Sequence, residues 1–158
     1  MSFYSPSKGE LELTEVVEDI LAYISEDLNR TYKLIVGSDS HPRVTNTCFV
    51  SAIIIHRQGK GARYYYNKTY EVRVKSLRQR IFYEASLSLE LADQLEQLLR
   101  QKGCEDMEVE IHLDIGTHGE TKELIREITG MVIGCGFNAC IKPNACAASK
   151  VADKHTKH

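Results

Sequence analysis

The chain has 158 residues, of which 20 are basic and 22 acidic, and its formal net charge is −2 at pH 7. This length suits one domain with a hydrophobic core of its own. The near-neutral charge excludes a bulk attraction to nucleic acid, so a polyanion would have to meet a local basic patch or bound metal ions.

No apolar run reaches the roughly 20 residues that span a bilayer, and the N-terminal sequence MSFYSPSKGELEL does not resemble a signal peptide. The five cysteines, at positions 48, 104, 135, 140 and 146, form no CxxC pair. An odd number of thiols without a secretory signal is typical of reduced cysteines. We therefore expect a cytoplasmic protein with no membrane partner, in which small buried thiols are favoured over a zinc site.

The first predicted element is an amphipathic helix over residues 12–29, because apolar side chains recur there at helical spacing. Three strand-like runs rich in Val, Ile, Tyr and Thr follow at 31–39, 47–57 and 62–74. Residues 58–61, Gln-Gly-Lys-Gly, join the last two runs and favour a hairpin. This part of the chain thus predicts one helix and three strands joined by hairpins.

A long helix is predicted over residues 76–101, with Ser76 as its N-cap and Gly103 just beyond its C-terminus. Shorter elements then alternate: a strand at 108–115, a helix from about 120 to 129, a strand near 137–143 and a helix over about 145–154. Three hairpin-connected strands followed by alternating helices and strands predict a mixed sheet flanked by helices.

This order resembles the ribonuclease H-like fold from the first strand onward. The resemblance implies an α/β domain with a mixed five-stranded sheet flanked by helices over residues 31–158. Residues 1–30 then form an extra N-terminal helical extension, and the two parts make a single domain. Because this architecture hosts many unrelated activities, function has to be argued from individual residues.

Two aspartates close strand-like runs: Asp39 ends KLIVGSD and Asp114 ends VEIHLD. A carboxylate at the end of a buried strand is costly to desolvate unless a positive charge meets it. Two such carboxylates in one small domain therefore indicate a shared metal site.

A third acid, Glu84, lies within the apolar stripe of the long predicted helix. The stripe follows spacings of three and four residues and consists of Leu77, Ile81, Glu84, Ser88, Leu91, Leu95 and Leu98. A glutamate on a sheet-facing stripe is unusual, and in the functional interpretation it points toward Asp39 and Asp114. The alternative is that Glu84 reaches solvent at the edge of the stripe, or pairs with Arg78 or Arg80.

Asp153 in the C-terminal tail is a fourth candidate, with His155 two residues further along. The alternative for this segment is solvated surface, because lysines lie on either side of the aspartate. Three or four carboxylates from separate elements are able to hold two Mg²⁺ or Mn²⁺ ions, which prefer oxygen ligands. In two-metal sites, one ion activates the attacking water and the other stabilises the leaving oxygen of a phosphodiester.

Four motifs resemble the YkuK-like family, a ribonuclease H-like family: IVGSDSH, the glutamate within YEASLSLELADQL, HLDIGTHG and KPNACAASKVADKHTK. The resemblance covers about residues 31–157. By the family's pattern it implies catalytic roles, with metal binding by the acids, for Asp39, Glu84, Asp114, and Asp153 or His155. It implies an activity inferred from the fold and supplies no substrate.

Differences from related groups narrow the comparison. Proofreading-type exonucleases carry Asp-x-Glu on the first strand, whereas this chain reads DSH at 39–41, and His41 is either a surface residue or a contact to metal or phosphate. His155 permits a comparison with Holliday-junction resolvases, which share the fold. The DIGT turn at 114–117 resembles the phosphate-binding turn of actin-like and sugar-kinase ATPases. Those proteins need two lobes and this chain has length for one, so ATP binding is disfavoured.

Basic and aromatic side chains lie near the proposed site. The basic residues are Arg73, Lys75, Arg78, Arg80, Lys142, Lys150, Lys154 and Lys157, and the tyrosines are Tyr64, Tyr65, Tyr66 and Tyr70. In one interpretation they bind phosphates and stack on bases; in the other, the charges are solvated and the tyrosines fill a sheet face. Two functions follow: a Mg²⁺- or Mn²⁺-dependent nuclease acting on DNA or RNA, and a non-catalytic module that binds nucleic acid or a protein partner.

Overall fold

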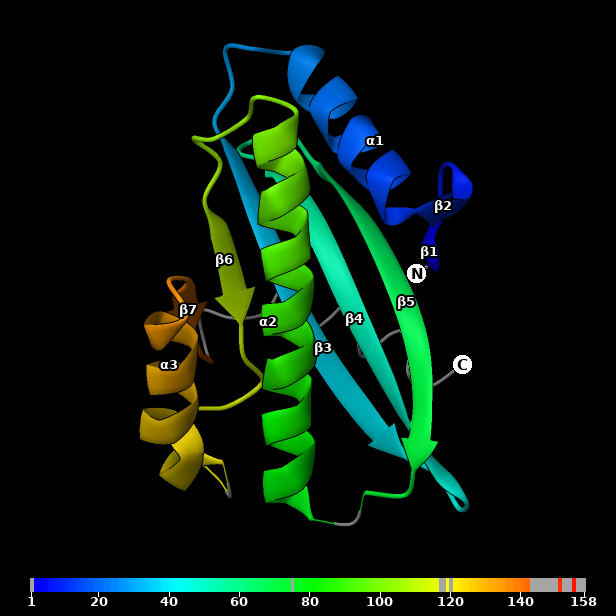
Figure 1. The fold of residues 1–158 in the computed structure, drawn as a ribbon, viewed down its shortest axis with the longest axis vertical. Coiled ribbons are helices and arrows are strands. Elements are labelled where there is room, and N and C mark those ends of the chain that lie inside the picture. Colours follow the sequence, from blue (N-terminus) through cyan, green and yellow to red (C-terminus); the bar gives the residue numbers. More distant parts are fainter. Residues whose placement is uncertain are drawn as a thin grey trace.

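The computed structural model describes residues 2–74, 76–116, 119, 121–142, 151 and 155. The strands are β1 (Ser2–Ser5), β2 (Gly9–Glu12), β3 (Tyr32–Pro42), β4 (Asn46–Arg57), β5 (Ala62–Val72), β6 (Val109–His112) and β7 (Asn138–Cys140). The helices are α1 (Leu13–Ser25), α2 (Leu77–Gln101) and α3 (Ile125–Gly134), and the short 3₁₀ helix η1 (Lys122–Leu124) leads into α3. Figure 1 shows how these elements are arranged.

The strands form one seven-stranded mixed sheet in the order β2-β1-β5-β4-β3-β6-β7. The strands β3, β4 and β5 pair antiparallel, whereas β6 pairs in parallel with β3 and β7 in parallel with β6. The predicted mixed α/β architecture is therefore confirmed, with long hairpins first and alternating elements afterwards. The predicted number of strands, five, was wrong.

The two additional strands form an N-terminal hairpin. The strands β1 and β2 pair antiparallel across a turn that ends at Gly9, whose φ is 77°, a conformation that glycine adopts readily. The hairpin joins the sheet beside β5, where Tyr4 pairs with Tyr66. Each strand has only four residues, which is too short for a periodic pattern to identify in the sequence.

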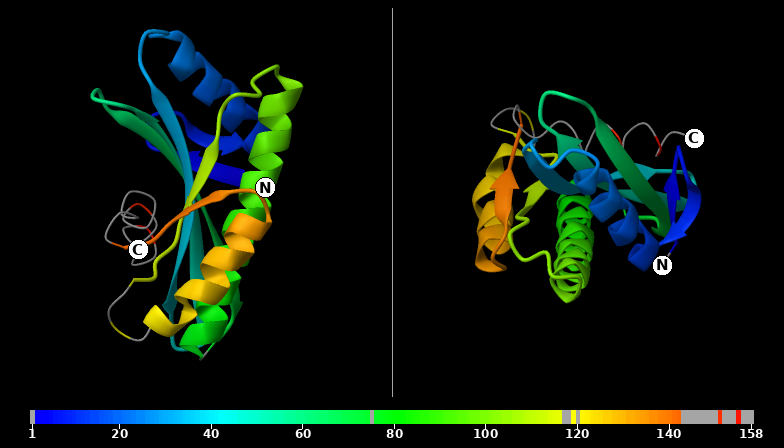
Figure 2. Two further views of the ribbon diagram at one scale, coloured as in Figure 1. Left: turned by 90° about the vertical axis from the view of Figure 1, so that its left-hand side faces the viewer. Right: turned by 90° about the horizontal axis from the view of Figure 1, so that it is seen from above.

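The helices α1, α2 and α3 all cover the same face of the sheet (Figure 2). Burial of apolar side chains between these helices and the sheet provides the main core. Its fully buried side chains include Val16, Val17, Ile20, Leu34, Val36 and Leu95. Among the described residues, no helix is both long and apolar enough to cross a membrane.

The opposite face of the sheet carries a smaller apolar cluster. Ile35 of β3 and Ile54 of β4 pack there with Tyr64 and Val151. Because side chains alternate along a strand, Ile35 and its neighbour Leu34 in the main core show which positions of β3 point to each face. The predicted tail helix over 145–154 lies outside the described residues, except for Val151.

The boundaries predicted for the long helix are confirmed in α2. The Oγ of Ser76 accepts a hydrogen bond from the backbone N–H of Gln79 at 3.3 Å, which caps the helix N-terminus. Beyond the C-terminus, Gly103 has φ 81°, the left-handed conformation that commonly ends a helix. Both ends of α2 therefore lie where the sequence predicts them.

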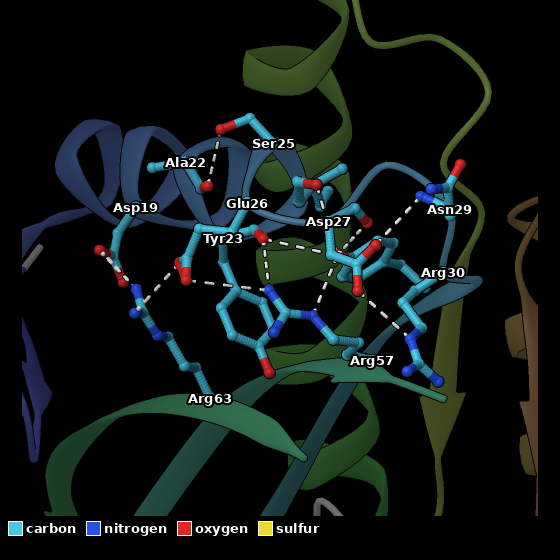
Figure 3. Close-up of polar contacts among 12 residues, drawn as sticks. Asp19, Ala22, Tyr23, Ser25, Glu26, Asp27, Asn29, Arg30, Arg57 and Arg63 are labelled. Carbon is cyan, nitrogen blue, oxygen red and sulfur yellow. Dashed lines mark hydrogen bonds and ion pairs between the residues drawn. The ribbon is translucent and has the colours of Figure 1, made fainter. Parts of the chain in front are cut away.

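A buried arginine joins the end of α1 to the sheet. Arg57, the last residue of β4, donates from Nη2 to the carbonyl of Tyr23 at 2.7 Å and from Nε to the hydroxyl of Tyr32 at 3.0 Å (Figure 3). Its guanidinium carbon lies 3.9 Å from the centroid of the Tyr23 ring, a distance at which a cation is attracted to the aromatic face. The predicted helix over 12–29 ends here, at Ser25.

Neighbouring charges extend this contact along α1. Nη1 of Arg63 in β5 lies 3.1 Å from Oδ1 of Asp19 in α1, and its Nη2 lies 3.5 Å from Oε2 of Glu26, the residue after α1 (Figure 3). The hydroxyl of the fully buried Tyr65 also donates to Asp19. Each charge in this region thus has a partner of opposite sign or a hydrogen-bonding group.

Candidate functional site

Asp39 and Asp114 lie at equivalent positions of neighbouring strands. The parallel register pairs Gly37 of β3 with His112 of β6, and each aspartate comes two residues later. Adjacent strands are about 4.8 Å apart, so extending this register brings the two aspartates side by side. Asp114 lies just beyond β6, which ends at His112. Asp39, which the sequence places at the end of a strand, lies within β3, because this strand continues to Pro42.

Glu84 is buried on the sheet-facing side of α2, with 6% of its surface exposed. Its Oε2 accepts a hydrogen bond from the Oγ of Ser40 at 2.5 Å, and Ser40 follows Asp39 directly in β3. The prediction that Glu84 lies on the buried face is confirmed, and the alternative that it reaches solvent is wrong. Arg78 pairs instead with Glu127 of α3, at 2.7 Å.

The three carboxylates influence one another electrostatically. The pKa of Glu84 is raised to about 8, chiefly because the carboxyl is buried and also because the charges of Asp39 and Asp114 lie nearby. The hydrogen bond from Ser40 and the charge of Arg80 act in the opposite direction. A buried carboxyl group whose pKa is raised by burial and by two other carboxylates is a candidate functional group.

Lys142 supplies a positive charge to this group. Its Nζ lies 2.7 Å from Oδ1 of Asp114, and its backbone N–H donates to the carbonyl of Ile115 at 2.9 Å. The hydrogen bond to Asp114 raises the pKa of Lys142, with further contributions from the charges of Asp114, Asp39 and Glu84. All three carboxylates therefore stabilise the charged form of Lys142.

Gly116 allows Lys142 to come this close. A Cβ at Gly116 would lie 3.1 Å from Cβ of Lys142, closer than side-chain atoms normally pack. The glycine of the DIGT turn thus has a packing role in the described structure. The next residues of that motif, Thr117 and His118, and also Glu120, lie outside the described residues.

Small buried hydroxyl groups lie near Glu84, between α2 and the sheet. The hydroxyl of Ser38 lies 2.8 Å from those of both Ser51 and Ser88, and all three serines are buried. Ser38 and Ser88 also line a cavity of about 10 Å³ together with Glu84 and Asp114. That volume is close to the minimum for one water molecule, so the protein leaves little space between α2 and the sheet here.

Of the two predicted site residues in the C-terminal tail, the structure describes one. Asp153 lies outside the described residues. The ring of His155 stacks on Tyr66 of β5, with centroids 3.7 Å apart and planes inclined by 13°. Because β4 lies between β5 and β3, this contact is two strands away from the strand of Asp39. The catalytic assignments of Asp153 and His155 remain predictions.

The other candidate nucleic-acid contacts differ in how far they are exposed to solvent. Tyr65 is fully buried in the main core, which agrees with the interpretation that tyrosines fill a sheet face. Tyr70 is 50% exposed, and the guanidinium carbon of Arg43 lies 5.4 Å from its ring centroid. His41, at the end of β3, is exposed.

A second cluster of potential metal ligands was missed in the sequence. Glu110 and His112 lie on one face of β6, and Cys140 of β7 pairs with His112 in the parallel register. One ligand atom from each residue lies within 4.8 Å of the others. The Glu-x-His spacing on a strand was a usable signal, but the pairing with a three-residue strand was not.

Comparison with known proteins agrees with the fold and the motifs. Residues 15–157 match the family described as ribonuclease H-like. The chain is also similar to a protein of Bacillus subtilis (strain 168) named uncharacterized protein YkuK, with 36% identity over 166 aligned residues that cover 98% of this chain and 96% of that protein. No solved structure is significantly similar to the chain. The chain therefore belongs to the ribonuclease H-like family, with YkuK as a relative over nearly its whole length.

Proposed function

We propose that the protein is a Mg²⁺- or Mn²⁺-dependent nuclease that hydrolyses phosphodiester bonds in DNA or RNA. Glu84 is the residue that carries this proposal. It is buried, it comes from a different element than Asp39 and Asp114, and both aspartates raise its pKa. Like charges gathered in this way are stabilised when a cation binds among them.

The donor set fits a hard divalent ion. Asp39, Glu84 and Asp114 offer only carboxylate oxygens, which Mg²⁺ and Mn²⁺ prefer, and Asp153 is the proposed fourth ligand. Their three potential negative charges exceed the single positive charge of Lys142. When bound, the ions would supply Lewis-acid activation of a water molecule and stabilisation of the leaving oxygen.

The chain's own residues have separate tasks in this proposal. Ser40 holds the Glu84 carboxylate in place through its 2.5 Å hydrogen bond. Lys142 has a side chain that is 56% exposed, so its ammonium is able to turn from Asp114 to a phosphate oxygen of the substrate. His155 is the candidate for proton transfer, because imidazole titrates near neutral pH.

The alternative function is a non-catalytic ribonuclease H-like module that binds nucleic acid or a protein partner. One observation favours it: the ammonium of Lys142 already lies 2.7 Å from Asp114. A lysine that permanently neutralises this aspartate would do part of the work of an ion without supplying its chemistry.

A cleavage assay separates the two functions. Labelled single-stranded, duplex, hybrid and branched nucleic acids are incubated with the protein and Mn²⁺, with a chelator as blank. We expect cleavage by the wild type, and a loss of at least about 100-fold in Asp39→Asn. The matched control is Asp93→Asn, which alters an exposed aspartate of α2 and should retain full activity.

Unchanged cleavage in Asp39→Asn would contradict the nuclease proposal. Binding of any of these substrates without cleavage, equally by wild type and Asp39→Asn, would instead support the non-catalytic module. Gel-shift measurements on the same samples provide that second readout.

A further inference from the structure

Three side chains of different chemistry converge at the β6–β7 edge of the sheet. The Nε2 of His112 lies 2.8 Å from Oε1 of Glu110, and the Sγ of Cys140 lies 3.0 Å from the same oxygen. The register places His112 opposite Cys140, and Glu110 lies two residues from His112 on the same strand face. One carboxylate oxygen is thus shared by an imidazole and a thiol.

The three side chains are buried to different degrees. His112 is only 5% exposed, and within the described part of the chain its Nδ1 has no hydrogen-bond partner. Buried polar nitrogens normally have one. Glu110 and Cys140 are partly buried, so the cluster lies beneath the surface with one side open.

We propose that Glu110, His112 and Cys140 bind one Zn²⁺ ion. A thiolate, an imidazole and a carboxylate are the ligands that zinc takes in proteins, whereas Mg²⁺ and Mn²⁺ prefer oxygen alone. On binding, the Cys140 thiol releases its proton to solvent and the imidazole ligates in its neutral form. The two negative ligands then balance the charge of the ion, and water completes the coordination.

A surface pocket reaches one of the three ligands, Glu110. It has a volume of about 220 Å³ and is lined by Lys33, Asp106, Glu108, Glu110 and Asn138, among others. The acidic side chains attract a cation. The Nζ of Lys33, 3.7 Å from Oε2 of Glu110, opposes it, but this side chain is 43% exposed and is able to move into solvent.

The ion would fasten a weak edge of the sheet. The edge strand β7 has three residues, and a ligand from each of two adjacent strands would cross-link it to β6. Asp114 lies two residues after His112, and Lys142 lies two residues after Cys140. An ion bound at the cluster would therefore also restrict the motion of Asp114 and Lys142 in the carboxylate site. The zinc site does not depend on the nuclease proposal, because it shares no ligand with the carboxylate site.

Cobalt substitution tests the site directly. The chelator-treated full-length protein is titrated with Co²⁺, which reports thiolate ligation through a charge-transfer band in the near ultraviolet, and then with Zn²⁺, which should displace it at one ion per chain. In Cys140→Ser we expect loss of the band and a Zn²⁺ affinity lower by about 100-fold or more. Cys135→Ser, which alters an exposed thiol in the preceding turn, should behave as the wild type.

Two further variants keep the test decisive. If Cys140→Ser fails to fold by circular dichroism, Glu110→Gln takes its place and should weaken Zn²⁺ binding at least about tenfold. Lys33→Gln should strengthen binding several-fold, because it removes a positive charge near the ion. Asp39→Asn should retain the cobalt band, which separates this site from the proposed nuclease centre.

The zinc proposal is overturned if the wild type shows no thiolate band. It is equally overturned if the band persists in folded Cys140→Ser, or if Glu110→Gln binds Zn²⁺ as tightly as the wild type.

Discussion

Two regions of this molecule bury a charged side chain, and the groups that surround the charge differ in sign between them. At the end of α1, Arg57 is 9% exposed and meets the carbonyl of Tyr23, the hydroxyl of Tyr32 and an aromatic face. Beneath α2, Glu84 is 6% exposed, accepts a hydrogen bond from Ser40 and is repelled by two other carboxylates.

The difference separates structural charges from functional ones. A buried charge surrounded by complementary groups holds elements together and needs nothing further. A buried charge surrounded by charges of its own sign lowers stability unless a ligand compensates it. The Arg57 region therefore serves as an internal reference for the carboxylate site, and exchanging single charges in each region tests the distinction.

The largest expected loss of stability comes from Arg57→Met. The substitution keeps an unbranched stem but removes two hydrogen bonds from a charged donor and the contact with the Tyr23 ring. We expect the melting temperature to fall by roughly 10 °C, measured by circular dichroism. Arg30→Met is the matched control, because Arg30 forms an exposed pair with Asp27, and its effect should stay within about 2 °C. Equal effects of both variants would show that the Arg57 network is not structural.

The next largest effect is a pH-dependent one at Glu84. Its pKa is raised from 4.5 to about 8, so the folded protein holds this proton more tightly than the unfolded chain. The resulting stabilisation is complete below about pH 4.5 and is lost as the pH rises through 8. In the presence of a chelator, we expect the wild type to lose about 3 kcal/mol of unfolding free energy from this group between pH 6 and pH 9.

Glu84→Gln should remove that loss, because the amide does not titrate. Urea unfolding at the two pH values measures the difference, and Glu90→Gln, at an exposed position of α2, should retain the wild-type pH dependence. If Glu84→Gln and the wild type show the same pH dependence, the carboxyl of Glu84 does not titrate in this range.

The two regions also differ in how far the sequence predicts them. The burial of Glu84 follows from helical spacing, and the proximity of Asp39 and Asp114 follows from their places at the ends of strand-like runs. Both are local patterns combined with the order of elements. The pairing of Arg57 with Tyr23 and Tyr32 depends on where α1 lies over the sheet, which no local pattern encodes.

Register explains the remaining differences. The strands β1 and β2 are too short to show alternation, so the sheet has two more strands than predicted. Cys140 meets His112 only through the pairing of a three-residue strand. The stacking of His155 on Tyr66 likewise joins distant parts of the chain, so the sequence motif alone could not locate this histidine.

A smaller effect is expected when divalent ions are added. If Asp39, Glu84 and Asp114 bind an ion, Mn²⁺ stabilises the folded state by about 1.4 kcal/mol at a free concentration ten times its Kd. The Mn²⁺ affinity should increase as the pH rises toward 8, because protons compete for Glu84. Thermal unfolding with and without Mn²⁺ measures both. Asp39→Asn should abolish the shift, whereas Asp93→Asn should retain it; a shift of equal size in Asp39→Asn would place the ion elsewhere.

The smallest change in stability is expected from Lys142→Met. This variant tests most directly whether the carboxylate site differs from the Arg57 region. Its pair with Asp114 is short, but the lysine side chain is 56% exposed, so the pair contributes at most about 1 kcal/mol. The Mn²⁺ affinity of Lys142→Met should nevertheless increase, because the ammonium and the ion compete for the same carboxylates. In that case a metal ion is able to replace the Lys142 ammonium at Asp114, whereas the Arg57 guanidinium stays in its place as part of the fold. If calorimetry shows that Mn²⁺ binds Lys142→Met no more tightly than the wild type, while the variant loses as much stability as Arg57→Met, Lys142 is a permanent partner of Asp114. The carboxylate site would then be a structural network of the same kind as the Arg57 region.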